Sequence, residues 1–469
     1  MAGTEDGRVL ERKGSGYYDA VGCRLESRDR QDDQYEVFQV LYVPKSTERV
    51  GELMTCSWDL DTKPLKTVYQ GLAARTSLVS LSLRFPSSRA PRPIVILPAI
   101  PNLRRLRVTN IDPLCYPDDL SVLILQSKKL QDLRMHWSPR MREEAEPSIN
   151  LRSYFGKCLE AQYHIPLESL AFQNFYGVNT GDLQDICDLE TIRNTEFINC
   201  FGGGTGSPGT IFVDETWKNI PGREYFKNFK RNRSSEISEP HAKILANISG
   251  LEELYLIGDK PVDQNGLSNG YSDGHQKSPA NDMFSPRSSS SHNPSPGRTL
   301  EQANAVLLKQ YLHILVAQHG QSIRKLLLHN SWALSGDQIS ELVSCCPHLE
   351  QLALGLSGDE PNAMRILAPF LTNLRCIRIL DNVWLEKSKA CDPELQEILA
   401  LDTPEPMLWK IAPTSKIKWS GIGDRVFRVG KSVQVPDEDG RPEWKREIWR
   451  ATWDDVKHID IWRLDCMEI

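Results

Sequence analysis

The chain has 469 residues, a formal net charge of −6 and 25% charged residues. This composition is that of an ordinary folded protein, and it excludes a strongly basic nucleic-acid-binding chain. No stretch approaches the roughly 18 apolar residues of a membrane-spanning helix, and the first residues lack the apolar run of a signal peptide. We therefore expect a cytoplasmic or nuclear protein without a membrane or nucleic-acid partner.

Chemistry-bearing motifs are weak along the chain. The eleven cysteines are scattered without a C-x-x-C pair, so they predict neither a disulfide framework nor a metal site. Gly204, Gly206 and Gly209 match G-x-G-x-x-G, but a strand-like segment follows them where a dinucleotide needs a helix N-terminus. We find no nucleophile with a nearby base, no paired carboxylates and no ligand-spaced histidines. These observations favour a protein that is not an enzyme and that carries no cofactor or metal.

The first part of the chain carries no repeated pattern. Residues 1–35 are polar and lack a sustained period, so we predict them to be disordered or poorly packed. Strand-like patterns follow at 35–44 and 53–60, and a proline opens a predicted helix over 64–74. Residues 1–75 are therefore predicted to form a polar N-terminal segment and a cap.

The main pattern is a repeated phrase, apolar-x-x-apolar-x-apolar, with helical apolar spacing between its copies. Its clearest copies start at Ile323, Leu349 and Leu374, which are 26 and 25 residues apart. A short strand with a returning helix cannot bury its apolar side alone, so such units stack. The pattern predicts an α/β fold, a leucine-rich-repeat solenoid with a curved parallel sheet and outer helices. Other copies start at Leu78, Leu103, Leu130, Leu167 and Leu251, and a degenerate one at Leu189.

Unrelated amphipathic strands would explain one or two of these copies, but not eight in phase. The repeats are predicted to occupy residues 76–258 and 299–382, and the first block contains an insertion at 201–235 with a basic stretch, KNFKRNR. Between the blocks, residues 259–298 have almost no large apolar side chains and are predicted to be a disordered Ser/Pro-rich insertion. Predicted helices lie at 117–130, 149–162, 238–248 and 299–318, and three Ser-Pro sites lie at Ser278, Ser285 and Ser295.

The last part of the chain departs from the repeats. Seven of the eleven tryptophans follow residue 383. Residues 416–436, 443–452 and 458–464 alternate apolar and polar positions, which is typical of strands. We interpret residues 383–469 as a Trp-rich β cap on the open end of the solenoid, with an aromatic ligand site as the less favoured alternative.

The repeated phrase also predicts which side chains line the concave face. Its apolar residues point inward, so its third, fifth and seventh positions lie on the concave side. In the first three units these positions are mostly basic, and such side chains suit an acidic or phosphorylated protein segment. A solvated face without a partner is the alternative interpretation. The candidate partner-binding residues are Arg84, Arg105, Arg107, Arg134 and His136. In the last three units the same positions are Lys325, Leu327, His329, Gln351, Ala353, Gly355, Cys376, Arg378 and Leu380.

Three segments together resemble a known family: IPNLRRLRVTNIDPLCYPDDLSVLILQSKKLQDLRMHW, GTIFVDETW and the ending GIGDRVFRVG…REIWRATWDDVKHIDIWRLDCMEI. Over residues 76–469 the chain resembles the leucine-rich-repeat part of filamentous-fungal F-box proteins. The resemblance implies a substrate receptor that docks on the Skp adaptor of a cullin ubiquitin ligase and holds a protein substrate on its repeats. Residues 1–60 show no recognisable F-box with its Leu-Pro start. The alternatives are a free-standing adaptor without a ligase and an enzyme with a pocket in the insertion at 201–235.

Overall fold

The structure is a computed structural model. Several predictions lie outside the residues that it describes: the strand at 35–44, the Ser/Pro-rich insertion with its three Ser-Pro sites, and most of the polar N-terminal segment. The described residues are 22–25, 54–59, 64–85, 94–112, 118–139, 151–177, 183–204, 207–211, 227–235, 237–258, 300–357, 370–380, 407–409, 415–436 and 439–469.

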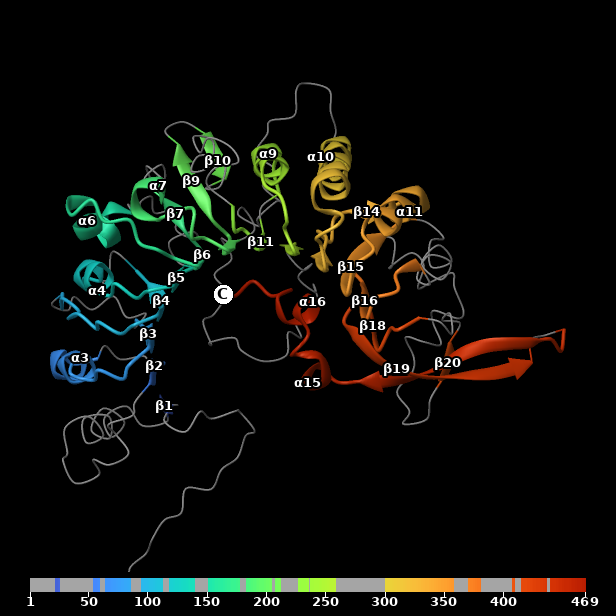
Figure 1. Cartoon of the computed structure of the whole chain (residues 1–469), viewed down its shortest axis with the longest axis horizontal. Helices are drawn as coiled ribbons and strands as arrows, with labels where there is room; N and C mark the ends of the chain where they lie inside the picture. Colours follow the sequence, from blue (N-terminus) through green and yellow to red (C-terminus); the bar gives the residue numbers. More distant parts are fainter. Residues whose placement is uncertain are drawn as a thin grey trace, which may run out of the picture.

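The fold is α/β, built on one large and mostly parallel sheet whose strands follow one another around an arc (Figure 1). From β2 to β18 each strand of the arc pairs in parallel with the next, and in all of them except β11 the alternate apolar residues are buried on the outer, helix-covered side. The strands are β1 (Gly22–Leu25), β2 (Thr55–Trp58), β3 (Ser80–Arg84), β4 (Arg105–Ile111), β5 (Asp132–Trp137), β6 (Ser169–Gln173), β8 (Asn194–Ile198), β11 (Arg231–Ser234), β12 (Glu253–Leu256), β13 (Lys325–Leu327), β15 (Gln351–Leu356), β16 (Cys376–Ile379) and β18 (Trp419–Ile422).

The repeated phrase predicts these strands well. Leu106, Leu133 and Leu352 are each at most 1% exposed, and the same position of every clear copy packs into one continuous apolar core. Burying one such side chain stabilises the fold by about 2 kcal/mol. Residues 22–25, which were predicted to be poorly packed, instead form β1 and extend the sheet next to β2. A short strand β14 (Ala333–Leu334) adds to the edge of β15.

Helices cover the outer side of the arc (Figure 1). Ser238 caps α9 by accepting a hydrogen bond from the His241 N–H, and Ser335 and Gln338 form a capping box on α11. The predicted helix at 117–130 is shortened to α4, and α10 continues into a π-helical turn, η6. The helices are α3 (Lys66–Ala73), α4 (Ser121–Gln126), α6 (Arg152–Glu160), α7 (Leu183–Ile186), α9 (Glu239–Asn247), α10 (Leu300–Ile314), η6 (Leu315–His319) and α11 (Gly336–Cys345).

Strand β11 comes from the stretch that the sequence presents only as basic. Its inward positions are polar, and Asn232 takes the place of a leucine and donates a hydrogen bond to Thr195 of β8, at 3.1 Å. His241 of α9 contacts the side-chain amide oxygen of Asn232 at 3.2 Å and the Tyr311 hydroxyl at 2.8 Å. A hydrogen-bonded network therefore replaces apolar packing at this point of the core.

The glycine-rich stretch lies in a small separate sheet on the outer side of the arc. Strand β9 (Phe201–Gly204) pairs in parallel with β7 (Tyr176–Gly177) and antiparallel with β10 (Ser207–Ile211). Gly204 and Gly209 therefore belong to two strands of a hairpin, and Thr210 and Ile211, directly after the motif, are part of β10.

The C-terminal part begins as predicted and then departs from the prediction. Strands β19 (Arg425–Pro436) and β20 (Pro442–Ala451) form a long antiparallel hairpin on β18, and β17 (Met407–Trp409) pairs with β20. The prediction of a strand at 458–464 is wrong. That stretch forms a turn and α16 (Asp460–Arg463), after α15 (Trp453–Val456), and it lies inside the arc (Figure 1). No helix in the described part of the chain is long and apolar enough to cross a membrane.

Candidate functional site

The concave side of the sheet carries rows of side chains at matching register. One row runs across eleven neighbouring strands, because each strand pairs with the next without a shift at this position. The row comprises Ser82, Arg107, Arg134, Ala171, Glu196, Arg233, Tyr255, Leu327, Ala353, Arg378 and Gly421. The concave face divides into two halves: the open half on β2–β5, where Ser57 of β2 continues the row, and the covered half on β6–β18.

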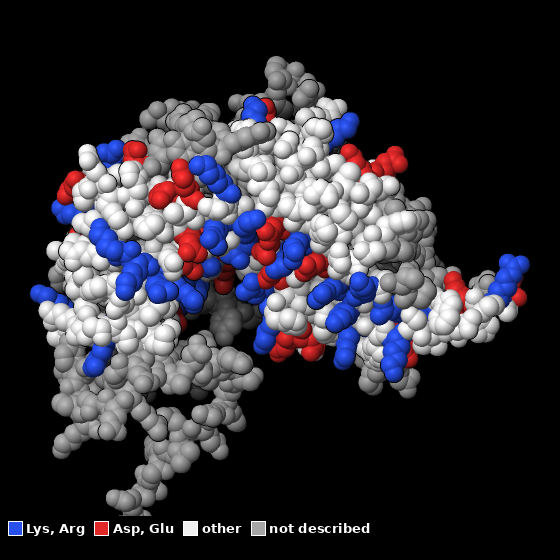
Figure 2. All heavy atoms as spheres, viewed as in Figure 1, with Lys and Arg blue, Asp and Glu red and all other residues white. Residues whose placement is uncertain are grey.

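The open half has a surplus of positive charge. Arg84, Arg105 and Arg107 are exposed, and none of the ion pairs or hydrogen bonds within the described residues uses their guanidinium groups. Arg105 and Arg107 are on β4, and Arg107 lies opposite Ser82 of β3. Figure 2 shows Lys and Arg side chains gathered over this part of the arc. An anion that meets this surface finds three unneutralised guanidinium groups, each able to bind a carboxylate or phosphate through two hydrogen bonds.

The two remaining predicted residues differ from these three. Arg134 of β5 pairs with Asp132 at 3.3 Å and with Glu196 at 3.5 Å, so its charge is already matched. Asn174 donates a hydrogen bond to His136 Nε2. Burial and the charges of Arg107 and Arg84 lower the pKa of His136 to about 4. His136 is therefore neutral at pH 7, and the charge of the patch comes from arginines alone.

The covered half is occupied by the chain's own segment 459–469. Arg378 of β16 is 3% exposed, donates a hydrogen bond to the Ile461 carbonyl at 3.1 Å and pairs with Asp465 at 2.7 Å. Lys325 of β13 pairs with Asp460 at 2.6 Å and with Glu253 at 2.9 Å. The segment thus supplies the acidic partner of Arg378 and one of the two acidic partners of Lys325.

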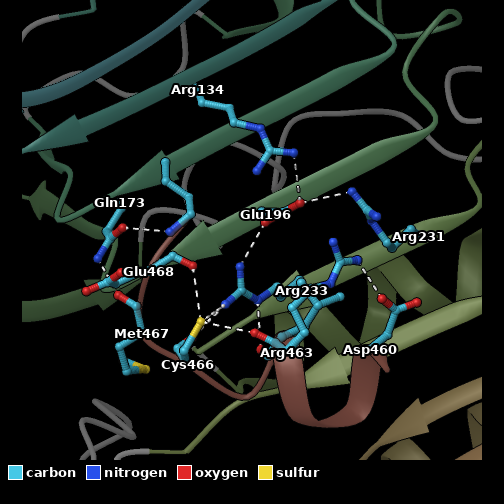
Figure 3. A network of polar contacts seen from close by, with 12 residues as sticks. Arg134, Gln173, Glu196, Arg231, Arg233, Asp460, Arg463, Cys466, Met467 and Glu468 are labelled. Atoms are coloured by element: carbon cyan, nitrogen blue, oxygen red, sulfur yellow. Dashed lines mark hydrogen bonds and ion pairs between the residues drawn. The ribbon is translucent and has the colours of Figure 1, made fainter. Parts of the chain in front are cut away.

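Around Glu196 the two halves meet in a network of charged groups (Figure 3). The carboxylate of Glu196 accepts hydrogen bonds from Arg231 and Arg233, both at 2.9 Å, and its pair with Arg134 reaches into the open half. Burial alone would raise the pKa of Glu196, but the charges of Arg134, Arg233 and Arg231 outweigh it, so the pKa lies below its ordinary value. Arg233 also donates to the carbonyls of Leu464 at 3.0 Å and Cys466 at 2.6 Å.

The segment ends on β6. Gln173 donates a hydrogen bond to the Met467 carbonyl and accepts one from the Ile469 N–H at 3.0 Å (Figure 3). Ile469 packs against Ala171 of β6 and two isoleucines, Ile198 and Ile257. Gln173 thus bonds only to main-chain atoms of the segment, so these two hydrogen bonds do not depend on which side chains the segment carries.

The segment also corrects one prediction. The last three units were expected to present their third, fifth and seventh positions on an open face. Instead Leu327, Ala353 and Trp462 of α16 pack together and are each at most 1% exposed, and His329 and Arg378 are buried. The sequence reasoning missed Gln173, Arg231 and Arg233, although each occupies a concave position of a repeat unit. It also missed Glu196, because the strand pairing starts the degenerate unit at Ile192 and not at Leu189.

No metal site appears among the residues that the structure describes. They contain no group of three or more His, Cys, Asp or Glu side chains that could hold a metal ion. A shallow pocket lies on the C-terminal hairpin, lined by Trp419, Arg428, Trp449 and Arg450 among others. In the insertion at 201–235, where an enzymatic pocket was the alternative, residues 212–226 lie outside the described ranges.

Comparison with known proteins adds no relative. No protein-family model matches the chain, and no curated protein matches it. What the chain does must therefore be argued from the concave face itself.

Proposed function

We propose that the chain is a leucine-rich-repeat solenoid that acts as a non-enzymatic protein-binding scaffold, with its partner held on the open half. In-register parallel strands, buried leucines at the repeated positions and outer helices support the repeat interpretation. The function rests on one observation, the unneutralised charge of Arg84, Arg105 and Arg107 on neighbouring strands. Elsewhere on the concave face such charges have partners, so an acidic or phosphorylated partner segment is the complement that the open half lacks.

The finer proposal is an F-box-like receptor that presents this partner to a cullin ubiquitin ligase through the Skp adaptor. Its support is the resemblance of residues 76–469 to the repeat part of fungal F-box proteins. A free-standing adaptor with the same open half is the second candidate, and the absence of a recognisable F-box pattern in residues 1–60 favours it.

Affinity purification of the tagged chain from cells that produce it, with mass spectrometry, tests both proposals. We expect wild type to enrich a protein partner, and Arg105→Glu/Arg107→Glu to lose that partner because two attractive charges become repulsive. The matched control is Arg428→Glu/Lys431→Glu, which changes two exposed charges on β19. If the Skp adaptor and a cullin co-purify with both wild type and the patch variant, the receptor role is supported. If only the partner co-purifies, the adaptor role stands, and a partner that binds the patch variant equally well contradicts both.

A further inference from the structure

The concave face holds residues 459–469 through main-chain hydrogen bonds and through buried side chains such as Ile461 and Trp462. Gln351 of β15 accepts the Ile461 N–H at 3.2 Å, and Arg378 of β16 donates to the Ile461 carbonyl. Arg233 on β11 then donates to two further carbonyls, and Gln173 on β6 bonds to the main chain at the end of the segment. Side chains from four strands therefore bind a main chain that lies across the strands.

The acidic side chains of this segment are also bound by the sheet. Its carboxylates meet basic side chains of the sheet: Asp460 pairs with Lys325, and Asp465 with Arg378. The hydrogen bonds of Lys325 and Arg463 help to hold the pKa of Asp460 below its ordinary value, although burial alone would raise it. The covered half thus shows how this face binds a peptide with acidic side chains, here one that forms the short helix α16 followed by a turn.

The row of concave side chains continues past the end of the segment. Beyond β6, where Gln173 bonds to Met467 and Ile469, the next strands are β5, β4 and β3, and their concave positions carry Arg134 and the exposed arginines. No described residue covers this continuation. A chain that extends the line of the segment would reach Arg134 of β5 first and then Arg107 of β4, with Arg105 beside it on the same strand.

The size of the open half decides what kind of partner fits. Strands lie about 4.8 Å apart and strands of this length extend roughly 17 Å, so β2–β5 present on the order of 250 Å². A folded protein needs roughly 800 Å² on each partner for a stable interface. About four extended residues, at about 3.3 Å each, span the same width. The open half therefore matches a linear segment better than a folded surface.

We propose that the open half binds a short, extended, acidic segment of a protein partner, with its main chain across β3–β5 and its carboxylates on Arg105 and Arg107. This inference rests on the proposed function and adds that the partner is recognised as a linear segment, so that a peptide alone suffices.

Fluorescence anisotropy with a labelled decapeptide of alternating Glu and Ser tests the inference on the full chain. We expect the peptide to bind wild type, and binding to weaken at least about tenfold when its glutamates are replaced by glutamines. Arg105→Gln/Arg107→Gln is expected to cause a similar loss, because it removes the two cations but keeps polar side chains. The matched control, Arg428→Gln/Lys431→Gln, is expected to bind like wild type, and circular dichroism verifies that every variant is folded.

Two results overturn the inference: no binding of the acidic peptide to wild type, or equal binding to wild type and the Arg105/Arg107 variant. The cellular purification separates this failure from that of the proposed function. If the peptide does not bind but the purified partner still depends on Arg105 and Arg107, the partner uses a folded surface and the scaffold role survives. If the partner is also indifferent to these arginines, both proposals fall.

Discussion

The open and covered halves of the concave face share one backbone geometry and differ in what lies on them. On the covered half, Arg233 and Arg378 are almost fully buried and bind carboxylates and carbonyls of the chain's own C-terminal segment. On the open half, Arg105 and Arg107 occupy equivalent positions of the repeat but are exposed and unpaired among the described residues. The repeat thus supplies cations on both halves, but on the open half the ion pairs of the described residues involve Arg134 and not Arg105 or Arg107.

The comparison also separates two roles for the same residue type. A buried arginine with a full set of partners is part of the folded core: removing Arg233, for example, takes one of three cationic partners from the buried carboxylate of Glu196. An exposed arginine without a partner contributes little to folding and remains available to bind. Stability measurements should therefore distinguish the two halves more sharply than sequence does.

The largest effect is expected from Arg233→Met. Methionine keeps part of the side-chain volume but removes the cation, and the carboxylate of Glu196, 3% exposed, then keeps only Arg231 and Arg134. The main-chain carbonyls of Leu464 and Cys466 lose their donor as well. Breaking one partner of a buried pair costs about 3–5 kcal/mol of the free energy of unfolding. Urea denaturation followed by tryptophan fluorescence measures this loss.

A double-mutant cycle with Glu196→Gln is the control for that prediction. Because the neutral amide no longer needs a counter-charge, the double variant should be more stable than the sum of the two single losses implies. Strict additivity would show that Glu196 and Arg233 do not interact in solution, and the comparison between the halves would then lose its main support.

The second-largest effect on the free energy of unfolding is expected from acid pH, through His241 in the core beneath the covered half. Burial lowers the pKa of His241 to about 4, while the unfolded chain binds that proton near pH 6.5. The unfolded state therefore holds more protons between these values, so stability is full above about pH 6.5 and is lost as pH falls toward 4. For this one histidine the loss amounts to about 3 kcal/mol.

The measurement is the free energy of unfolding of wild type and His241→Gln at several pH values from 7 to 4. Glutamine is expected to lower stability at pH 7, since it disturbs the bonds to Asn232 and Tyr311, but to flatten the dependence on pH. His136 and His329, whose pKa values burial also lowers to about 4, keep part of the slope in the variant. Parallel pH curves for the two proteins would mean that His241 takes up its proton without unfolding.

The sequence predicts the sheet well wherever the repeated apolar positions are filled by leucine or its equivalents. It fails at β11, because Asn232 and Ser234 occupy those positions and make hydrogen bonds instead of apolar contacts. The signal was nevertheless present: Phe229 begins a unit in which Arg231 and Arg233 fall on the concave positions. Extending the repeat spacing through this polar stretch would have placed both arginines on the concave face.

The candidate site was predictable in part. The concave positions of the first units were identified from the phrase alone, and Arg84, Arg105 and Arg107 lie exposed on the concave face as expected. The covered half was not, since alternation in residues 458–464 favoured a strand. Asp460, Ile461 and Trp462 instead form a short helix whose buried side chains pack on the sheet, a long-range contact that no local pattern encodes.

The smallest effect on folding is expected from Arg105→Gln/Arg107→Gln, the variant that abolishes peptide binding. Both side chains are exposed and have no anionic partner within the described residues, so their removal should change the free energy of unfolding by no more than about 0.5 kcal/mol. The sign should favour the variant slightly at low salt, because two like charges near Arg84 are removed, and the gain should fade as salt screens them. Denaturation curves at low and high ionic strength measure both effects. A loss of several kcal/mol would instead place these arginines in the folded core, like Arg233, and would leave the open half without a free binding surface.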